Sequence, residues 1–208
     1  MNQVLFGNKS ITPSKIVCIG RNYVEHIHEL NNEIPDEPVL FIKPNSAISQ
    51  HLSSKSDEPI HYEAELCFIV ENSKLAGVGF GLDLTKRALQ QQLKTKGLPW
   101  ERAKAFDGSA VFSRFVPLDM AIDTLELELH INNQLVQQAS PALMMYKPNQ
   151  LLQFINEFMT LEDGDIIMTG TPKGVGQVHH KAQFLGQIVV NENNEVPVTL
   201  IEQNWTAA

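Results

Sequence analysis

Short apolar runs separated by glycine, proline and polar residues dominate the chain, a pattern typical of β-strands joined by turns. We expect strands at residues 15–20, 39–44, 61–70, 77–81, 166–169, 188–190 and 196–201. Residues 124–138 predict a hairpin that turns at Asn132-Asn133, and strict alternation in its first strand places Glu126 and Glu128 on the solvated face. Alternating glycines in the strand at 77–81 predict that other backbone approaches it closely.

Three segments have the spacing of helices. Residues 21–30 suit a helix of two or three turns with Asn22 as its N-cap and Asn31-Asn32 at its end. Leucine or alanine at 84, 88, 89 and 93 predicts a helix over 84–94, with Asp83 directly before it. Residues 151–159 predict a third, amphipathic helix.

Composition limits the class of protein. The 208 residues are 43% hydrophobic, so the chain can bury a substantial core, and its length suits a single domain over 1–208. The net charge of -8, with lysine and arginine scattered, argues against nucleic acid as a partner. We expect no membrane partner and a cytoplasmic protein, because the sequence lacks a signal-peptide pattern and any run near the roughly 20 apolar residues of a membrane span. Cys18 and Cys67 lie in apolar runs and are expected to be free thiols.

The most informative stretch is His61-Tyr62-Glu63-Ala64-Glu65-Leu66, which precedes a continuous apolar run. Successive side chains of a strand point to opposite faces, so Glu63 and Glu65 would point the same way, at the mouth of a cleft. Two carboxylates held so close require a cation. The alternative is an ordinary solvated strand face, as expected for Glu126 and Glu128, and spacing alone does not decide between the two.

Two further motifs offer chemistry. His26 and Glu29 are three residues apart on the expected helix, where a carboxylate fixes the imidazole tautomer and raises its basicity, as a general base for water requires. The alternative is an exposed polar helix face shared with His28. Asp83 is either a residue that favours the start of the next helix or a third carboxylate of the same site.

Six blocks of residues, in order along nearly the whole chain, together resemble one family. They are Gly20-Arg21-Asn22-Tyr23 with His26 and Glu29; residues 37–44; residues 61–66; residues 82–85; Gly97-Leu98-Pro99-Trp100 with Lys104; and residues 164–176, which include Gly170-Thr171-Pro172-Lys173-Gly174. This order resembles the fumarylacetoacetate hydrolase family, above all its small single-domain acylpyruvate hydrolase and oxaloacetate decarboxylase members.

The resemblance implies a fold and a set of site residues. The fold would be α+β, a mixed, mainly β sheet curled into a barrel-like roll with a few peripheral helices, and the protein would be a homodimer. Glu63, Glu65 and Asp83 match the family's carboxylate ligands for Mg²⁺ or Mn²⁺. By the same matching, His26 and Glu29 activate water, Lys104 neutralises charge on the substrate, and the residues that contact the substrate are Arg21, Gln90 and Thr171.

The implied substrate is a small 2-oxo acid. The first hypothesis is metal-dependent hydrolysis of a C–C bond in 2,4-diketo acids such as acylpyruvates, through an enolate that the metal stabilises. The alternative in the same site is decarboxylation or keto-enol isomerisation of oxaloacetate or a related diacid, which shares the enolate but needs no attacking water. A third hypothesis, a binding protein without catalysis, is disfavoured by the intact ligand and dyad positions.

Overall fold

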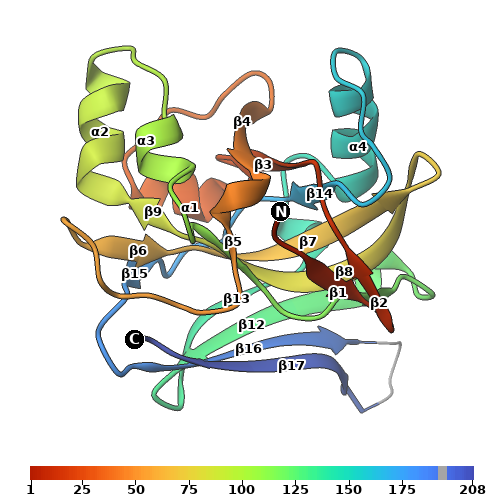
Figure 1. Ribbon diagram of the computed structural model, residues 1–208. Coiled ribbons are helices and arrows are strands. Elements are labelled where there is room, and N and C mark those ends of the chain that lie inside the picture. Colours follow the sequence, from red (N-terminus) through yellow and green to blue (C-terminus); the bar gives the residue numbers. More distant parts are fainter. Residues whose placement is uncertain (192–195) are drawn as a thin grey trace.

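The structure, a computed structural model, describes residues 1–191 and 196–208. A mixed eight-stranded sheet forms its centre, a four-stranded antiparallel sheet packs beneath it, and most helices lie on the upper side of the central sheet (Figure 1). The remaining strands of the described residues form two small sheets. The predicted α+β fold, a mainly β sheet curled into a barrel-like roll with a few peripheral helices, is confirmed.

The central sheet joins strands that are far apart in the chain. From edge to edge it contains β4 (Val39–Pro44), β3 (Lys15–Gly20), β14 (Ile166–Met168), β7 (Ala64–Glu71), β8 (Lys74–Asp83), β10 (Ala110–Phe112) and β5 (Ile48–Ser49), and β11 (Val116–Pro117) also pairs with β8. Strand β14 lies parallel to β3 and antiparallel to β7. The expected strands at 15–20 and 39–44 are confirmed, and the one expected at 166–169 ends one residue earlier.

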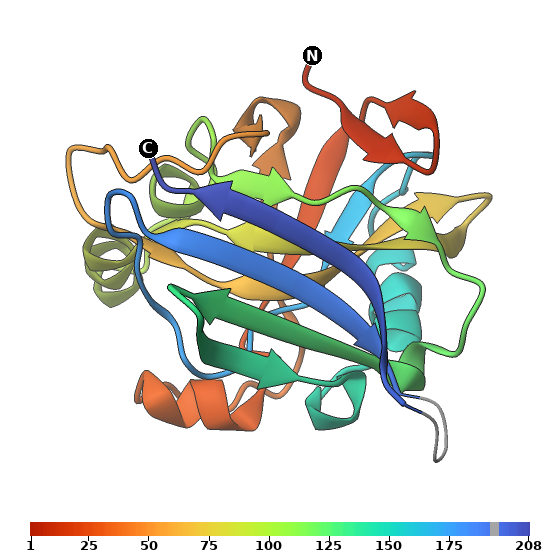
Figure 2. The same ribbon diagram turned by 90° about the horizontal axis from the view of Figure 1, so that it is seen from below.

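The lower sheet is a simple antiparallel array (Figure 2). It contains β13 (Gln134–Ala139), β12 (Leu125–Ile131), β16 (Gln183–Val190) and β17 (Val198–Thr206). Asn132 and Asn133 have φ angles of 50° and 66°, which a tight hairpin turn requires, so the predicted hairpin is confirmed. The two closing strands are present, but β16 begins at 183 instead of 188, and β17 begins at 198 instead of 196.

The small sheets are peripheral to these two layers. One pairs β1 (Val4–Phe6) with β2 (Lys9–Ile11), and the other contains β15 (Gly176–Gln177), β6 (Ile60–Tyr62) and β9 (Thr85–Lys86).

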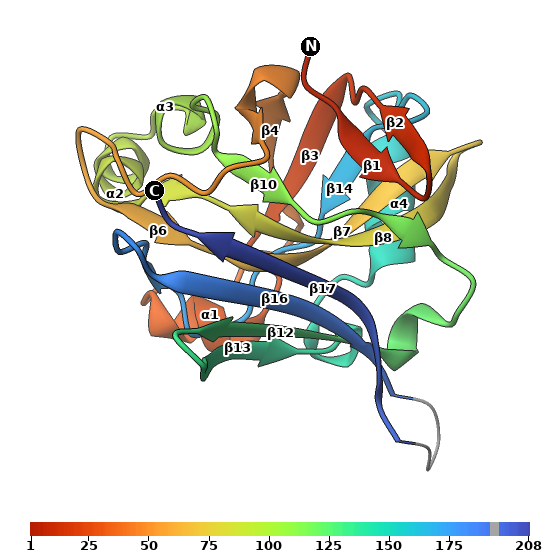
Figure 3. The same cartoon turned by 60° about the horizontal axis from the view of Figure 1, so that its bottom comes forward.

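The main core fills the space between the two large sheets (Figure 3). Alternate residues of β7, such as Leu66 and Phe68, contribute to this core, whereas Cys67 and Ile69 pack in a second cluster with residues of β3 and β14. Strand β7 is therefore buried on both faces, which explains its continuous apolar sequence. Cys67 is a fully buried free thiol, as predicted, and so is Cys18.

The glycines of β8 allow side chains to approach that strand. A Cβ atom at Gly79 would lie 2.7 Å from the ring of Phe115, and one at Gly77 would lie 2.5 Å from the ring of Phe6. A carbonyl oxygen, that of Val116, also lies close to Gly77. The predicted close approach of other backbone therefore occurs at Gly77, whereas at Gly79 and Gly81 the close atoms belong to side chains.

Two of the three predicted helices, those over 21–30 and 84–94, are shorter in the structure than the sequence pattern predicts. The helices are α1 (Val24–Glu29), α2 (Arg87–Thr95), α3 (Glu101–Lys104) and α4 (Pro148–Asn156), with single 3-10 turns at Asn45–Ala47, Ile122–Thr124 and Pro141–Leu143. Helix α4 begins three residues before the predicted start because Pro148 occupies its first position and the Gln150 side chain accepts a bond from the Lys147 N–H. In the described part of the chain, no helix is long and apolar enough to cross a membrane.

The predicted N-cap of α1 is wrong. Tyr23, in an extended conformation, precedes the helix, and Asn22 is buried one residue further back. The amide of Asn22 donates to the carbonyl oxygens of Tyr146 and Thr169 at 3.0 Å and 2.8 Å, and its Oδ1 accepts from the Tyr146 N–H. Asn22 thus connects three distant segments, and the predicted end of the helix, where Asn31 has a φ of 51°, is confirmed.

Asp165 anchors the start of β3 to the turn before β14. Its buried carboxylate accepts bonds from the N–H groups of Ser14, Lys15 and Glu162 and from the Ser14 hydroxyl, and it pairs with the Lys15 ammonium. Burial alone raises the pKa of this carboxyl, but the bonds from Lys15 and Ser14 outweigh burial, so the pKa lies below its usual range. The charged form therefore stabilises the fold.

Asp165→Asn should reduce the free energy of unfolding by about 2 kcal/mol at neutral pH, because charge-assisted bonds to a buried group are lost. Because the pKa of Asp165 is lower in the folded state, its ionisation stabilises the folded protein at pH values above the unfolded-state pKa of about 3.9. This stabilisation is lost as the pH falls through the folded-state pKa. The difference from wild type should therefore shrink below about pH 4. Urea denaturation at several pH values measures the free energy of unfolding of both proteins, and the exposed Asp163→Asn is the control. A difference between wild type and Asp165→Asn that does not depend on pH would contradict the prediction.

Candidate active site

Three buried carboxylates meet where β6, β7 and β8 come together. Glu63, Glu65 and Asp83 are each no more than 5% exposed, and one oxygen from each lies within 4.8 Å of the others. Strand β6 ends at Tyr62 and β7 begins at Ala64, so the strand predicted over 61–70 is interrupted at Glu63. The interruption lets β6 pair with β9 while β7 pairs with β8, yet both carboxylates still converge.

Asp83 arrives from a different element than predicted. It is the last residue of β8, and α2 begins only at Arg87, because Thr85 and Lys86 pair with β6 as a short strand. The N–H of Asp83 donates to the Glu63 carbonyl oxygen at 2.8 Å, which fixes the two residues side by side. Asp83 is therefore not a helix-starting acid, and its carboxylate points into the cluster.

Three cations compensate the three carboxylates. The Lys104 Nζ lies 2.7 Å from both Glu63 Oε2 and Asp83 Oδ2 and also donates to the Thr85 hydroxyl. The Lys43 Nζ lies 2.8 Å from Asp83 Oδ1, and Arg87 pairs with Glu63 Oε1. Lys43 and Lys104 are themselves buried, so the cluster is a set of opposed charges removed from water.

The cations are distributed unequally among the acids. Burial raises the pKa of Glu63, but Lys104, Arg87 and His26 lower it more, so the net pKa is well below its usual value. Among the described residues, the Glu65 carboxylate accepts a hydrogen bond only from the Gly170 N–H, at 2.7 Å. Burial, together with the charges of Asp83 and Glu63, raises the pKa of Glu65 well above the ordinary value. Glu65 is therefore the carboxylate with the least local compensation.

The arrangement fits a divalent cation. Asp83 Oδ1 is buried and has no hydrogen-bond donor among residues 1–191 and 196–208, because Lys43 approaches it without hydrogen-bond geometry. An orphaned carboxylate oxygen beside two further carboxylates supplies the hard, anionic donors that Mg²⁺ and Mn²⁺ prefer. Glu63, Glu65 and Asp83 could therefore hold such an ion together.

His26 and Glu29 form a hydrogen-bonded pair beside the cluster. The His26 Nδ1 lies 2.9 Å from Glu29 Oε2, and Glu29 Oε1 accepts the Gly174 N–H at 2.9 Å. His26 is buried, whereas its neighbour His28 is exposed, so the two histidines of α1 are not equivalent. A carboxylate on Nδ1 leaves the lone pair on Nε2, which is the nitrogen a general base uses.

A pocket beside the cluster brings together most of the predicted site residues. Its walls include Arg21, His26, Glu63, Gln90, Lys104 and Thr171. Thr171 is already engaged, because its hydroxyl donates to the Ala64 carbonyl oxygen and accepts from the Gln137 amide. Gln90 accepts from Arg87 at 2.9 Å, and Arg21 donates to the Glu33 carbonyl oxygen from a left-handed backbone with φ of 59°.

Sequence reasoning missed three cations near this pocket. Lys43 is fully buried against Asp83, Arg87 pairs with Glu63, and Lys94 lines the pocket further along α2. Two signals were available in the sequence. Lys43 stands between the apolar run 39–42 and Pro44, and Arg87 follows Asp83 by four residues. Neither pattern indicates the partner, because the partner lies in a distant part of the chain.

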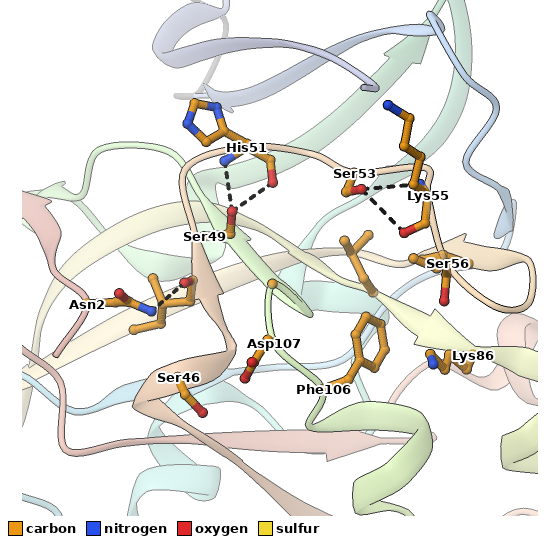
Figure 4. Close-up of a pocket in the computed structure, with 14 residues that line it drawn as sticks. Asn2, Ser46, Ser49, His51, Ser53, Lys55, Ser56, Lys86, Phe106 and Asp107 are labelled. Carbon is orange, nitrogen blue, oxygen red and sulfur yellow. Dashed lines mark hydrogen bonds between the residues drawn. The ribbon is translucent and has the colours of Figure 1, made fainter.

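A larger hollow elsewhere does not share this chemistry (Figure 4). It is lined by polar side chains, among them Ser49, His51, Ser53 and Lys55, and no residue of the carboxylate cluster contributes to it. Ser49 bonds the backbone of His51, and Ser53 bonds that of Lys55, so these hydroxyls satisfy the local loop (Figure 4). Size alone therefore does not identify the site.

Comparison with known proteins agrees with the geometry. The family model described as fumarylacetoacetate (FAA) hydrolase C-terminal matches residues 15–199. A relative from Escherichia coli strain K12, named oxaloacetate tautomerase, is 40% identical over 181 residues, which is 78% of this chain and 83% of that one. A human mitochondrial protein with the same enzyme name is 38% identical over 78% of this chain and 81% of its own.

Solved structures show the same architecture. A candidate fumarylacetoacetate isomerase/hydrolase from Oleispira antarctica covers the whole of both chains with a TM-score of 0.91 at 34% identity. The fumarylpyruvate hydrolase of Pseudomonas aeruginosa, solved with Mn²⁺ and pyruvate, has a TM-score of 0.83 at 26% identity, over 90% of this chain and 91% of that one. The matched sequence, the shared fold and the relatives together show that this chain belongs to the fumarylacetoacetate hydrolase family.

Proposed function

We propose that the protein is a metal-dependent oxaloacetate tautomerase, which interconverts the keto and enol forms of this 2-oxo diacid. The enzyme name of the relatives supports the isomerase alternative more than the C–C hydrolysis that the sequence placed first. The proposed metal ligands are Glu63, Glu65 and Asp83, and the ion is Mg²⁺ or Mn²⁺. The homodimer and the single domain over 1–208 stay predictions.

The observation that carries this proposal is the charge balance of the cluster. When all three buried carboxylates are ionised, as metal ligands must be, the charges of Lys43, Lys104 and Arg87 balance theirs. A divalent cation would then leave two positive charges at the cluster, and Arg21 and Lys94 add positive charge to the same pocket, so a substrate with two carboxylates would compensate more of this charge than a substrate with one. Because uncompensated charge is expensive away from water, this site favours a dianion over a substrate with one carboxylate.

The proton transfer is assigned to His26. A divalent ion held by the three carboxylates would act as a Lewis acid for the oxygens of a 2-oxo acid. His26 Nε2 would accept a proton from C3 of the keto form and return a proton to the oxygen at C2, while Glu29 stabilises the imidazolium in between. Lys104 would balance negative charge on that oxygen, and Arg21, Gln90 and Thr171 are proposed to contact the substrate.

Hydrolysis of 2,4-diketo acids is the second candidate. The same pair, His26 and Glu29, has the arrangement needed to activate water, and a fumarylpyruvate hydrolase shares the fold. Decarboxylation of oxaloacetate would use the same cluster without water. The three reactions differ in their products, so a single panel of substrates separates them.

With Mg²⁺ or Mn²⁺, the wild-type protein should accelerate the ketonisation of enol-oxaloacetate, and a chelator should abolish this activity. Loss of enol absorbance measures the first reaction, while released carbon dioxide and cleaved acetylpyruvate report decarboxylation and hydrolysis. Activity that survives exhaustive chelation would rule out the metal-dependent mechanism, and faster cleavage of acetylpyruvate than ketonisation would favour the second candidate.

His26→Gln should lower kcat by about a hundredfold or more, because general base catalysis by a positioned side chain contributes roughly 10²–10⁴-fold. The matched control is His28→Gln, which makes the same change two residues further along α1 at an exposed position. Binding of Mn²⁺, followed by calorimetry, should be retained in both variants. Equal activities for the two variants would remove His26 from the mechanism.

Glu65→Gln should abolish the increase in Tm that Mn²⁺ causes, because a ligand that binds only the folded state raises its stability. The metal-free variant should melt close to the metal-free wild type, since burial raises the pKa of Glu65 and a neutral amide resembles the protonated acid. Glu126→Gln on the solvated face of β12 is the control. A normal Mn²⁺ response in Glu65→Gln would contradict the ligand assignment.

A further inference from the structure

Helix α2 presents a stripe of polar side chains to the pocket. Arg87, Gln90 and Lys94 follow one another at intervals of three and four residues, the spacing of one helix face, and all three line the same pocket. Arg87 pairs with Glu63 at the inner end of the stripe. Lys94 lies two turns further along the helix, about 10 Å from Arg87 along the axis, so it marks the outer end.

Lys94 is held in place by neutral groups. Its Nζ donates to Asn32 Oδ1 at 2.6 Å and lies 6.0 Å from the centre of the Trp100 ring. Both partners also line the pocket. An amide oxygen and an aromatic face position an ammonium group without cancelling its charge.

No ion pair in the described part of the chain cancels the positive charge at the outer end of the pocket. Within residues 1–191 and 196–208, neither Lys94 nor Arg21 forms an ion pair with a carboxylate. Burial, and then the nearby charges of Arg21 and Arg87, lower the pKa of Lys94, as expected where cations crowd together. An anion at this position would relieve that repulsion.

We propose that Lys94 is the specificity-determining residue that binds the second carboxylate of a dicarboxylic 2-oxo acid, at the end of the α2 stripe that lies away from Arg87. This inference rests on the proposed function and names the residue that selects the diacid. The first carboxylate and the keto oxygen would lie at the cluster, while the second reaches the outer end of the α2 stripe. The same site would bind a 2-oxo acid with one carboxylate without using Lys94.

A structural role for Lys94 makes a different prediction. If the ammonium only holds Asn32, in the segment after α1, against helix α2, its removal should weaken the binding of all ligands alike. A role in specificity should instead affect only ligands with a second carboxylate. The decisive measurement is therefore a ratio of affinities for two ligands.

The test compares Lys94→Met with Lys96→Met, which removes the same charge from an exposed position two residues further on. Calorimetry with the Mn²⁺-loaded proteins measures the Kd of pyruvate, which has one carboxylate, and of difluoro-oxaloacetate, which has two and cannot enolise. Lys94→Met should raise the Kd of difluoro-oxaloacetate by about tenfold or more, which is the effect of losing a charge-assisted hydrogen bond. The Kd of pyruvate should rise by less than about twofold. Lys94→Arg should restore most of the affinity for difluoro-oxaloacetate, and Lys96→Met should change the Kd of neither ligand.

Turnover gives a second readout. Lys94→Met should raise KM for oxaloacetate by a similar factor while kcat changes little, because the bond from Lys94 to the second carboxylate would be equally strong in the ground state and in the transition state. If Lys94→Met weakened the binding of both ligands equally, or of neither, the assignment of Lys94 would be overturned. If wild type bound the diacid through Lys94 but failed to tautomerise oxaloacetate, the proposed function would fall and the specificity assignment would stand.

Discussion

The structure depends on the mutual compensation of buried charges around Glu63, Glu65 and Asp83. Neither the acids nor Lys43 and Lys104 could remain ionised away from water alone, since each would carry a desolvation cost of several kcal/mol. Together they form a network in which every cation contacts at least one acid. The network in turn requires that β4, β8 and α3 lie close to one another, so the fold and the site constrain each other.

The two sheets supply the rigidity that this network needs. Strand β7 is buried on both faces, which fixes Glu65 at the inner end of a strand that cannot shift without exposing two cores. Asp83 is the last residue of the neighbouring strand, and its backbone is bonded to that of Glu63. The acids are therefore carried by the least deformable part of the molecule, whereas His26 is carried by a short helix at its edge.

Much of the fold could be predicted from local pattern, because the apolar runs at 15–20 and 39–44 encode strands directly. The failures occurred where tertiary contacts decided the outcome. Pairing with β6 turned Thr85 and Lys86 into a strand, which delayed α2 and moved Asp83 from a helix start to a strand end. Asn22 suits an N-cap by residue type, but three backbone partners from distant segments engage its side chain instead.

The candidate site was predicted more completely on its acidic side than on its basic side. Resemblance and spacing placed the three acids and the His26–Glu29 pair, which the fold brings together. Spacing alone could not assign Lys43, Arg87 or Lys94, because a lysine or arginine in a strand or helix is ordinary until its partner is known. Those partners are 40, 24 and 62 residues away in the chain for the contacts Lys43–Asp83, Arg87–Glu63 and Lys94–Asn32.

The bond from Gly174 to Glu29 has a consequence for how the imidazole ring of His26 is held. It joins residues 145 positions apart, and Gly174 has a left-handed backbone in which any side chain would collide with the Val136 carbonyl oxygen. The Glu29 carboxylate that orients His26 is therefore itself held by a contact between α1 and the 170–176 loop. Separation of these two segments would free one oxygen of Glu29, and the tautomer of His26 would then be held by a carboxylate anchored through α1 alone.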